Sequence, residues 1–212
     1  MAAIGFRPAR RMDGSPWNGA VVRCSVLSGI ANIFIGDSVI LAGTSSASPV
    51  DGAILNDLAL CTAGGRVYGV VTGVIPVGTS GTSAPNLQIV YGATNAYREV
   101  LVAVVSPELV FEATIDTAVL AVGAALQGTM YDVTPTVSTN TTQGISAHVL
   151  AQASASTTSA GWMFLGVRND PANIGGLTSG TTVVASTSAS PTIIEVVCTE
   201  PQVHITQLGA GV

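Results

Sequence analysis

Leu109-Val110-Phe111-Glu112-Ala113-Thr114-Ile115 is the run whose pattern says most about the fold. Apolar residues occupy every second position from Leu109 to Ile115, so their side chains share one face of an extended strand. Val and Ile dominate most other apolar runs of the chain. These β-branched residues pack well on pleated sheets and lose rotamer freedom in helices. The pattern therefore predicts a protein built from strands.

Short apolar runs recur along the chain between clusters of Gly, Ser, Thr and Pro, which is typical of strands joined by turns. They predict strands at residues 20–27, 33–41, 66–75, 87–91, 98–105, 109–115, 145–150, 162–167, 193–198 and 202–206. The polar stretches predict loops at residues 42–52, 76–86 and 134–144. Two Ser/Thr/Ala stretches predict exposed hairpin tips or edge strands at residues 151–160 and 178–190.

Helix signals are weak by comparison. The best lies at residues 116–127, where Asp116 or Thr117 can cap a short apolar run that Gly123 interrupts. We therefore expect at most one short helix. Regularly spaced short strands with glycine-rich turns predict an all-β fold, either an antiparallel β-barrel or a β-sandwich.

The composition points to a folded protein with an unusually uncharged surface. The chain has 212 residues, of which 48% are hydrophobic and only 9% charged, with a formal net charge of −5. Its mean hydropathy of +0.56 excludes a wholly disordered chain. At this length a core can form without disulfide or metal staples. Free monomers usually carry more charge, so we expect much of this surface to meet other subunits.

The N-terminal segment differs from the rest in charge and in conformation. Residues 1–23 carry four arginines and one aspartate, whereas the remainder carries three arginines and eleven acidic residues. Prolines and glycines between Pro8 and Gly19 deny this segment a helix and favour an extended path. It is either a frayed terminus or an arm that docks on an acidic partner. Phe6 and Trp17 need apolar surface, which either the protein's own body or a neighbour can supply.

Several other classes of protein are disfavoured by what the sequence lacks. Cys24, Cys61 and Cys198 are widely spaced without a CxxC pair, which predicts small buried hydrophobes and no disulfide framework or zinc site. The N-terminus lacks the apolar region of a signal peptide, and no apolar run reaches membrane-spanning length. We expect a soluble protein made in a reducing cytosol. A pI of about 4.7 without a basic, aromatic-rich stripe disfavours nucleic-acid binding.

One short motif suggests an enzyme, but its context argues against one. Ile33-Phe34-Ile35-Gly36-Asp37-Ser38 resembles the Gly-Asp-Ser nucleophile block of SGNH hydrolases, and Gly166-Val167-Arg168-Asn169-Asp170 resembles their Gly-x-Asn-Asp block with one residue too many. The general base would be His204, yet Pro201 stands where that family places its Asp. Those hydrolases are α/β proteins, and flanking helices are missing here. We expect His148 to be a structural ring, and we predict no enzyme, no cofactor and no metal site.

The opening of the chain carries a second resemblance. Gly5-Phe6-Arg7-Pro8-Ala9-Arg10-Arg11-Met12-Asp13-Gly14-Ser15-Pro16-Trp17-Asn18-Gly19 resembles the start of decoration, or cement, proteins from capsids of tailed bacteriophages. These often begin with a Gly-Phe-Arg-Pro element followed by a Gly-Ser-Pro-aromatic-Asn-Gly turn. Phe34-Ile35-Gly36-Asp37-Ser38-Val39-Ile40-Leu41, Gly144-Ile145-Ser146 and Phe164-Leu165-Gly166-Val167-Arg168-Asn169-Asp170-Pro171 are similar to later elements of the same family.

This resemblance implies a noncatalytic virion protein that binds the outer surface of an assembled capsid and staples neighbouring major capsid protein subunits. It implies a homotrimer, synthesised in the bacterial cytoplasm, that binds neither membrane nor nucleic acid. Residues 1–22 would be an extended capsid-binding arm and residues 23–212 a β-rich decoration domain of β-tulip or jelly-roll-like form. The expected capsid-binding residues are Phe6, Arg7, Pro8, Arg10, Arg11 and Trp17. The alternative is a tail, fibre or adhesin-like binding module of a phage virion.

Overall fold

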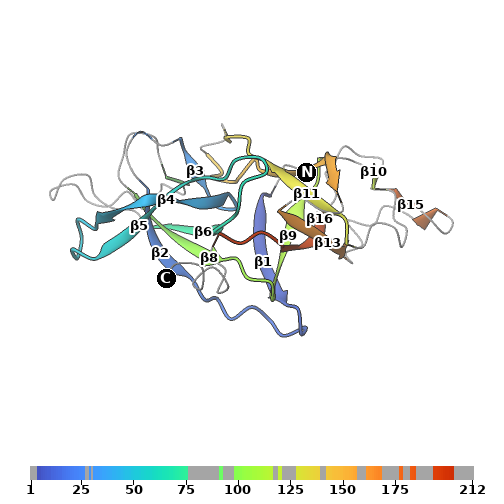
Figure 1. Cartoon of the computed structure of the whole chain (residues 1–212), viewed down its shortest axis with the longest axis horizontal. Helices are drawn as coiled ribbons and strands as arrows, with labels where there is room; N and C mark the ends of the chain where they lie inside the picture. Colours follow the sequence, from blue (N-terminus) through green and yellow to red (C-terminus); the bar gives the residue numbers. More distant parts are fainter. Residues whose placement is uncertain are drawn as a thin grey trace, which may run out of the picture.

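The protein is all-β, as the sequence predicts. The computed structural model describes residues 4–26, 29, 31–75, 91–92, 98–116, 119–120, 128–138, 142–156, 161–168, 177–178, 182–184 and 193–202. Every regular element within these ranges is a strand. Two β-structures dominate: a closed barrel on the left of Figure 1 and a six-stranded sheet on the right.

The barrel is formed by five strands in the order β2 (Val22–Val26), β5 (Ile54–Leu60), β4 (Ser38–Ala47), β6 (Gly69–Ile75) and β8 (Arg98–Val104). All neighbours are antiparallel except β2 and β5, which are parallel. Alternate side chains point inward, so that Val71 and Val102 join the barrel's interior while Val70 and Ala103, one residue away, face the sheet.

The six-stranded sheet is antiparallel throughout, in the order β1 (Phe6–Arg11), β9 (Leu109–Thr114), β16 (Ile193–Cys198), β13 (Trp162–Val167), β11 (Met130–Thr134) and β12 (Val149–Ser156). A bridge between Ile115 and Leu150 brings β12 back toward the end of β9, so the sheet curls on itself. Two small sheets complete the fold: β3 (Ile33–Phe34) with β7 (Tyr91–Gly92), and β10 (Val119–Leu120) with β15 (Thr182–Val184) and β14 (Leu177–Thr178).

The larger hydrophobic core lies between the sheet and the outer face of the barrel. Trp162 is at its centre, fully buried, with Phe6 stacked on it at 4.5 Å between ring centroids and Phe111 edge-on at 5.3 Å. Aromatic side chains contribute more buried apolar area than any other type, and such ring pairs add to it. This aromatic cluster, contributed by β1, β9 and β13, joins the N-terminal strand to the body of the protein.

Most predicted strands are present, with informative differences. The predicted strand at 33–41 is split by a turn at Gly36, whose φ of +95° a non-glycine residue rarely adopts. The predicted loop at 42–52 is wrong at its start, because β4 continues to Ala47. Strands β1, β5 and β11 were not predicted. The stretch at 151–160 contains most of β12, an edge strand of the sheet, as one of the two predicted alternatives has it.

Three further predictions fall largely outside the described residues. Within the predicted helix at 116–127, Asp116 lies in a bend and Val119–Leu120 form a strand, and the other residues are not described. Of the predicted strands at 87–91 and 202–206, only Tyr91 and Gln202 are described.

The N-terminal segment is not a free arm over residues 6–11. β1 pairs with β9 from Phe6 opposite Ala113 to Arg11 opposite Leu109, with a bulge between Pro8 and Arg10. The boundary predicted at residue 22 therefore cuts β1 from the sheet to which it belongs. Proline and the bulge hide the two-residue period in the sequence, which is why this strand looks irregular there.

We expect Phe6→Ala to destabilise the protein by about 3–5 kcal/mol, because it leaves a cavity against Trp162. Phe6→Leu, which keeps most of the volume, should cost about 1.5 kcal/mol or less. Urea unfolding followed by circular dichroism measures both. Equal, small losses in the two variants would contradict the assignment of Phe6 to the core.

Candidate functional site

The arginines of β1 form a row of ion pairs with the sheet on which β1 lies. Arg7 bonds Glu112 at 2.6 Å, Arg10 bonds Glu195 at 2.7 Å, and Arg11 bonds Glu108. Arg168 lies 3.4 Å from the same carboxylate oxygen of Glu112. These pairs are partly exposed, where ion pairs contribute only about 0–1 kcal/mol each. The predicted basic arm is therefore largely neutralised by the protein's own carboxylates.

The other predicted site residues differ in how deeply they are buried and in what they contact. Phe6 is 1% exposed and supplies apolar surface to the protein's own core. Pro8 lies opposite Phe111 in the ladder between β1 and β9. Trp17 is half-buried and packs against the larger core. The protein's own body therefore supplies apolar surface to both Phe6 and Trp17, which is one of the two sources predicted from the sequence.

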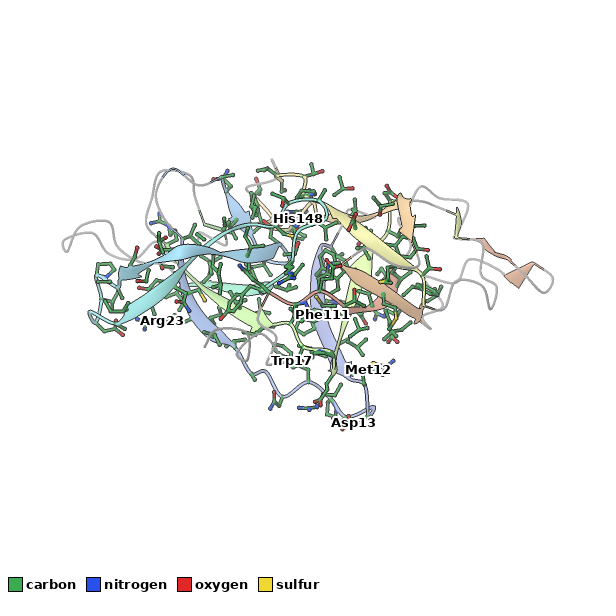
Figure 2. The ribbon with its side chains drawn as sticks, in the orientation of Figure 1. Met12, Asp13, Trp17, Arg23, Phe111 and His148 are labelled. Atoms are coloured by element: carbon green, nitrogen blue, oxygen red, sulfur yellow. The ribbon has the colours of Figure 1, made fainter. Side chains whose placement is uncertain are left out.

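The residues after β1 form a tight, exposed turn. The Arg11 amide donates to the Ser15 carbonyl at 2.8 Å, and the Asp13 carboxylate accepts bonds from both the amide and the hydroxyl of Ser15. Those bonds lower the pKa of Asp13. The Met12 amide donates to the Glu108 carbonyl at 2.7 Å, which fixes the turn to the body. Met12, with 48% exposure, and Asp13 lie at the lower rim of the molecule in Figure 2.

An apolar cleft of about 250 Å³ lies beside this turn. Its lining comes from two stretches of the chain and one further residue: Trp17, Asn18, Ala20, Val21 and Val22; Val104, Ser106, Glu108 and Leu109 around the β8–β9 connection; and Arg11. Val21 and Val22 are exposed. We call this hollow the Trp17 cleft.

Asp37, Ser38 and His148 meet in the interior, each no more than 1% exposed. His148 Nδ1 lies 3.1 Å from Ser38 Oγ, and Nε2 lies 3.6 Å from Asp37 Oδ1. His204, the base that the resemblance to SGNH hydrolases would require for Ser38, lies outside the described residues. Residues 38 and 148 are 110 positions apart, so only the fold reveals the contact.

The hydrogen bonding fixes the state of the His148 ring. The Ser38 backbone amide donates to Nδ1 at 3.2 Å, and an amide can only donate, so Nδ1 carries no proton. The proton of the neutral ring is therefore on Nε2 and faces Asp37. Since Ser38 is completely buried, a substrate has no access to its hydroxyl in this structure. These contacts tie the turn that carries Ser38 to the loop that carries His148.

Backbone hydrogen bonds around the Asp37–Ser38–His148 group join three segments of the chain. The Ser146 amide donates to the Ile35 carbonyl at 3.0 Å, and the Phe6 amide donates to the Gly36 carbonyl at 2.8 Å. A Cβ on Gly5 would lie 2.5 Å from Ser146 Cβ, so only glycine fits there. The start of β1, the turn at 34–38 and the loop at 144–148 are thereby locked together.

Burial shifts the pKa of both titratable groups in opposite directions. Desolvation raises the pKa of Asp37 to about 6 and lowers the pKa of His148 to about 4. At neutral pH the aspartate is charged and the histidine neutral.

Burial also raises the pKa values of Cys24 and Cys61 to about 11 and that of Cys198 to about 12. All three cysteines are free and buried, which confirms their prediction as small buried hydrophobes.

The described part of the chain contains no group of three or more His, Cys, Asp or Glu side chains arranged to hold a metal ion. No helix among the described residues is long and apolar enough to cross a membrane. Comparison with known proteins finds no matching family model, no matching curated protein and no matching solved structure.

We expect Asp37→Asn and His148→Asn to change the pH dependence of stability in opposite directions. In Asp37→Asn, burial still lowers the pKa of the remaining His148 from 6.5 to about 4 in the folded protein. The contribution of this residue to the free energy of unfolding is therefore fully present above pH 6.5 and is lost as the pH falls toward 4. In His148→Asn the remaining Asp37 has a raised pKa, so stability is greatest below its unfolded pKa and is lost as the pH rises through 6.

Urea unfolding between pH 4 and pH 7 measures the free energy of unfolding of both variants. In each variant it should change by an amount on the order of 1–3 kcal/mol across that range. In the natural protein the two effects oppose each other, which should flatten its profile. Parallel profiles for the two variants would show that the pair is not titrating as described.

Proposed function

We propose that this protein is a noncatalytic structural component of a phage virion, which binds the outer surface of the assembled capsid and staples neighbouring major capsid protein subunits. The observation that carries the proposal is the placement of the stretch that resembles capsid decoration proteins. Gly5–Gly19 forms an edge strand and a hydrogen-bonded turn at the surface. A segment so placed is suited to contact a partner over an extended line.

The buried Asp37–Ser38–His148 group supports a noncatalytic role. It reproduces the residue types of a hydrolase triad, yet its hydroxyl is sealed from solvent. A nucleophile must reach the substrate carbonyl to act, which burial prevents. The sparse charge of the chain supports the same role, because large contact surfaces favour few charged residues at their centres.

The structure changes how attachment would work. β1 is held by the protein's own sheet, so the contact surface is the outward side of β1 and the turn that follows it. Arg7, whose side chain is 52% exposed, and Met12 lie on this surface. Several copies acting together convert modest single contacts into durable attachment when their spacing matches the capsid lattice. Binding only the expanded capsid would stabilise that state by mass action.

A tail, fibre or adhesin-like module is the second candidate function. It shares the all-β architecture and the Ser/Thr-rich, weakly charged composition. Electron microscopy of labelled virions separates the two: copies spread over the head support decoration, and copies confined to one vertex support the tail or fibre role.

The decisive measurement mixes purified protein with undecorated capsids and counts bound copies per major capsid protein subunit. Removing residues 1–19 would also remove Phe6 from the core, so a point substitution at the surface is the sharper test. We expect Met12→Asp to weaken capsid binding at least about tenfold, equivalent to about 1.4 kcal/mol, by placing a charge in the contact.

Val137→Asp is the matched control, since Val137 is an apolar side chain of similar exposure, 41%, in a different part of the protein. It should bind as the natural protein does. Failure of the natural protein to bind any capsid form would refute decoration. Unchanged binding by Met12→Asp would show that the turn is not the contact.

A further inference from the structure

Asn18 and Gly19 lie in an exposed stretch between two anchored parts of the chain. On one side Trp17, at the lower side of the molecule in Figure 2, packs against the larger core, and on the other side β2 begins at Val22. Asn18 and Gly19 belong to no strand, and both are exposed. Asn18 is also the only asparagine of the chain that is followed by glycine. This pair is therefore open to water and is not held in a sheet.

The Asn18 side chain is folded over the backbone that follows it. The Ala20 amide donates to Asn18 Oδ1 at 3.1 Å, so the side-chain carbonyl closes a ring around Gly19. A hydrogen bond to a carbonyl oxygen polarises the carbonyl and makes its carbon more susceptible to nucleophilic attack. The carbon concerned here is Asn18 Cγ.

The amide nitrogen of Gly19 is the nearest nucleophile in the chain sequence, and it is unobstructed. A Cβ built on Gly19, whose φ is +77°, would meet no heavy atom within 4 Å. Within the described part of the chain, no hydrogen bond holds the Gly19 amide. Because glycine has no side chain, its amide nitrogen can approach the preceding side chain more closely than that of any other residue.

We propose that Asn18 is a site of spontaneous deamidation, which proceeds through a cyclic imide with Gly19. The Gly19 nitrogen loses its proton to solvent and bonds to Asn18 Cγ, while the Cγ–Nδ2 bond breaks and ammonia leaves with a proton taken from water. Water then opens the imide. Breaking its bond to Cγ gives aspartate, whereas breaking its bond to the backbone carbonyl carbon gives isoaspartate.

A second turn in the same segment has similar geometry but the wrong chemistry. The Ser15 amide donates to the Asp13 carboxylate at 2.9 Å, much as Ala20 donates to Asn18, and Gly14 follows Asp13. Hydrogen bonds from Ser15 lower the pKa of Asp13, so this side chain is ionised at neutral pH. A carboxylate repels a nucleophile and offers no neutral leaving group. We therefore expect the reaction at Asn18 and not at Asp13.

Deamidation changes the charge of the Trp17 cleft. Asn18 lines this cleft with Arg11 and Glu108, which already form an ion pair with each other. Arg11 is the only cation among the described lining residues, so the new carboxylate has no cation left to pair with and the wall becomes acidic. The net charge becomes one unit more negative than the −5 of the unmodified chain. This inference does not depend on the proposed capsid role.

The test is peptide mapping by mass spectrometry of the folded protein, aged at neutral pH and digested with trypsin at mildly acidic pH, where the amide is stable. Asn18 lies in the tryptic peptide of residues 12–23. Asn56 is the internal control, because it is also exposed but lies in β5. We expect Asn18 to convert at least about tenfold faster than Asn56, with both aspartate and isoaspartate as products.

Two variants complete the experiment. Asn18→Asp provides the reference peptide for the aspartate product. Asn18→Gln keeps the amide but requires a larger ring, so its peptide should stay unchanged and ion exchange should show no acidic form accumulating. Circular dichroism confirms that the aged proteins are folded. An unchanged Asn18, conversion no faster than at Asn56, or conversion without isoaspartate would each overturn the inference.

Discussion

The packing of Phe6 and Phe111 on Trp162 determines how the rest of the molecule is arranged. These three rings come from the first strand, a central strand and a strand late in the chain, so their contact brings distant segments into one sheet. The barrel then covers the same core with residues such as Val70 and Ala103. Because apolar burial is the main favourable term in folding, this cluster makes the N-terminal strand part of the body.

That placement governs the polar chemistry around it. Once β1 lies against β9, its arginines come within bonding distance of Glu108, Glu112 and Glu195, and its amide at Phe6 reaches the turn at Gly36. The buried junction of His148 with that turn follows from the same approach. A segment that looks like a basic, unattached arm in the sequence is thus a neutralised edge strand. This shifts the proposed capsid contact from the whole segment to its outward face and the turn after it.

The same reasoning explains why the most enzyme-like motif of the chain lies in the buried interior. Asp37 and Ser38 follow a short buried strand, and the glycine before them permits the turn that aims both side chains inward. His148 completes a group with the composition of a catalytic triad in a place that solvent does not reach. Residue types and spacing can suggest such chemistry, but access decides it.

The alternation of apolar residues, as in Leu109 to Ile115, was enough to predict an all-β protein and most of its strands, because strand periodicity is a local property. The burial of the three cysteines was also predictable, because a cysteine without a nearby cysteine partner packs as a small hydrophobic residue. The pairing of β1 with β9, the Phe6–Trp162 stack and the Ser38–His148 contact were not, since each joins residues about a hundred or more positions apart. Such contacts arise from the packing of whole sheets, and no local pattern encodes which distant segment fills a given place.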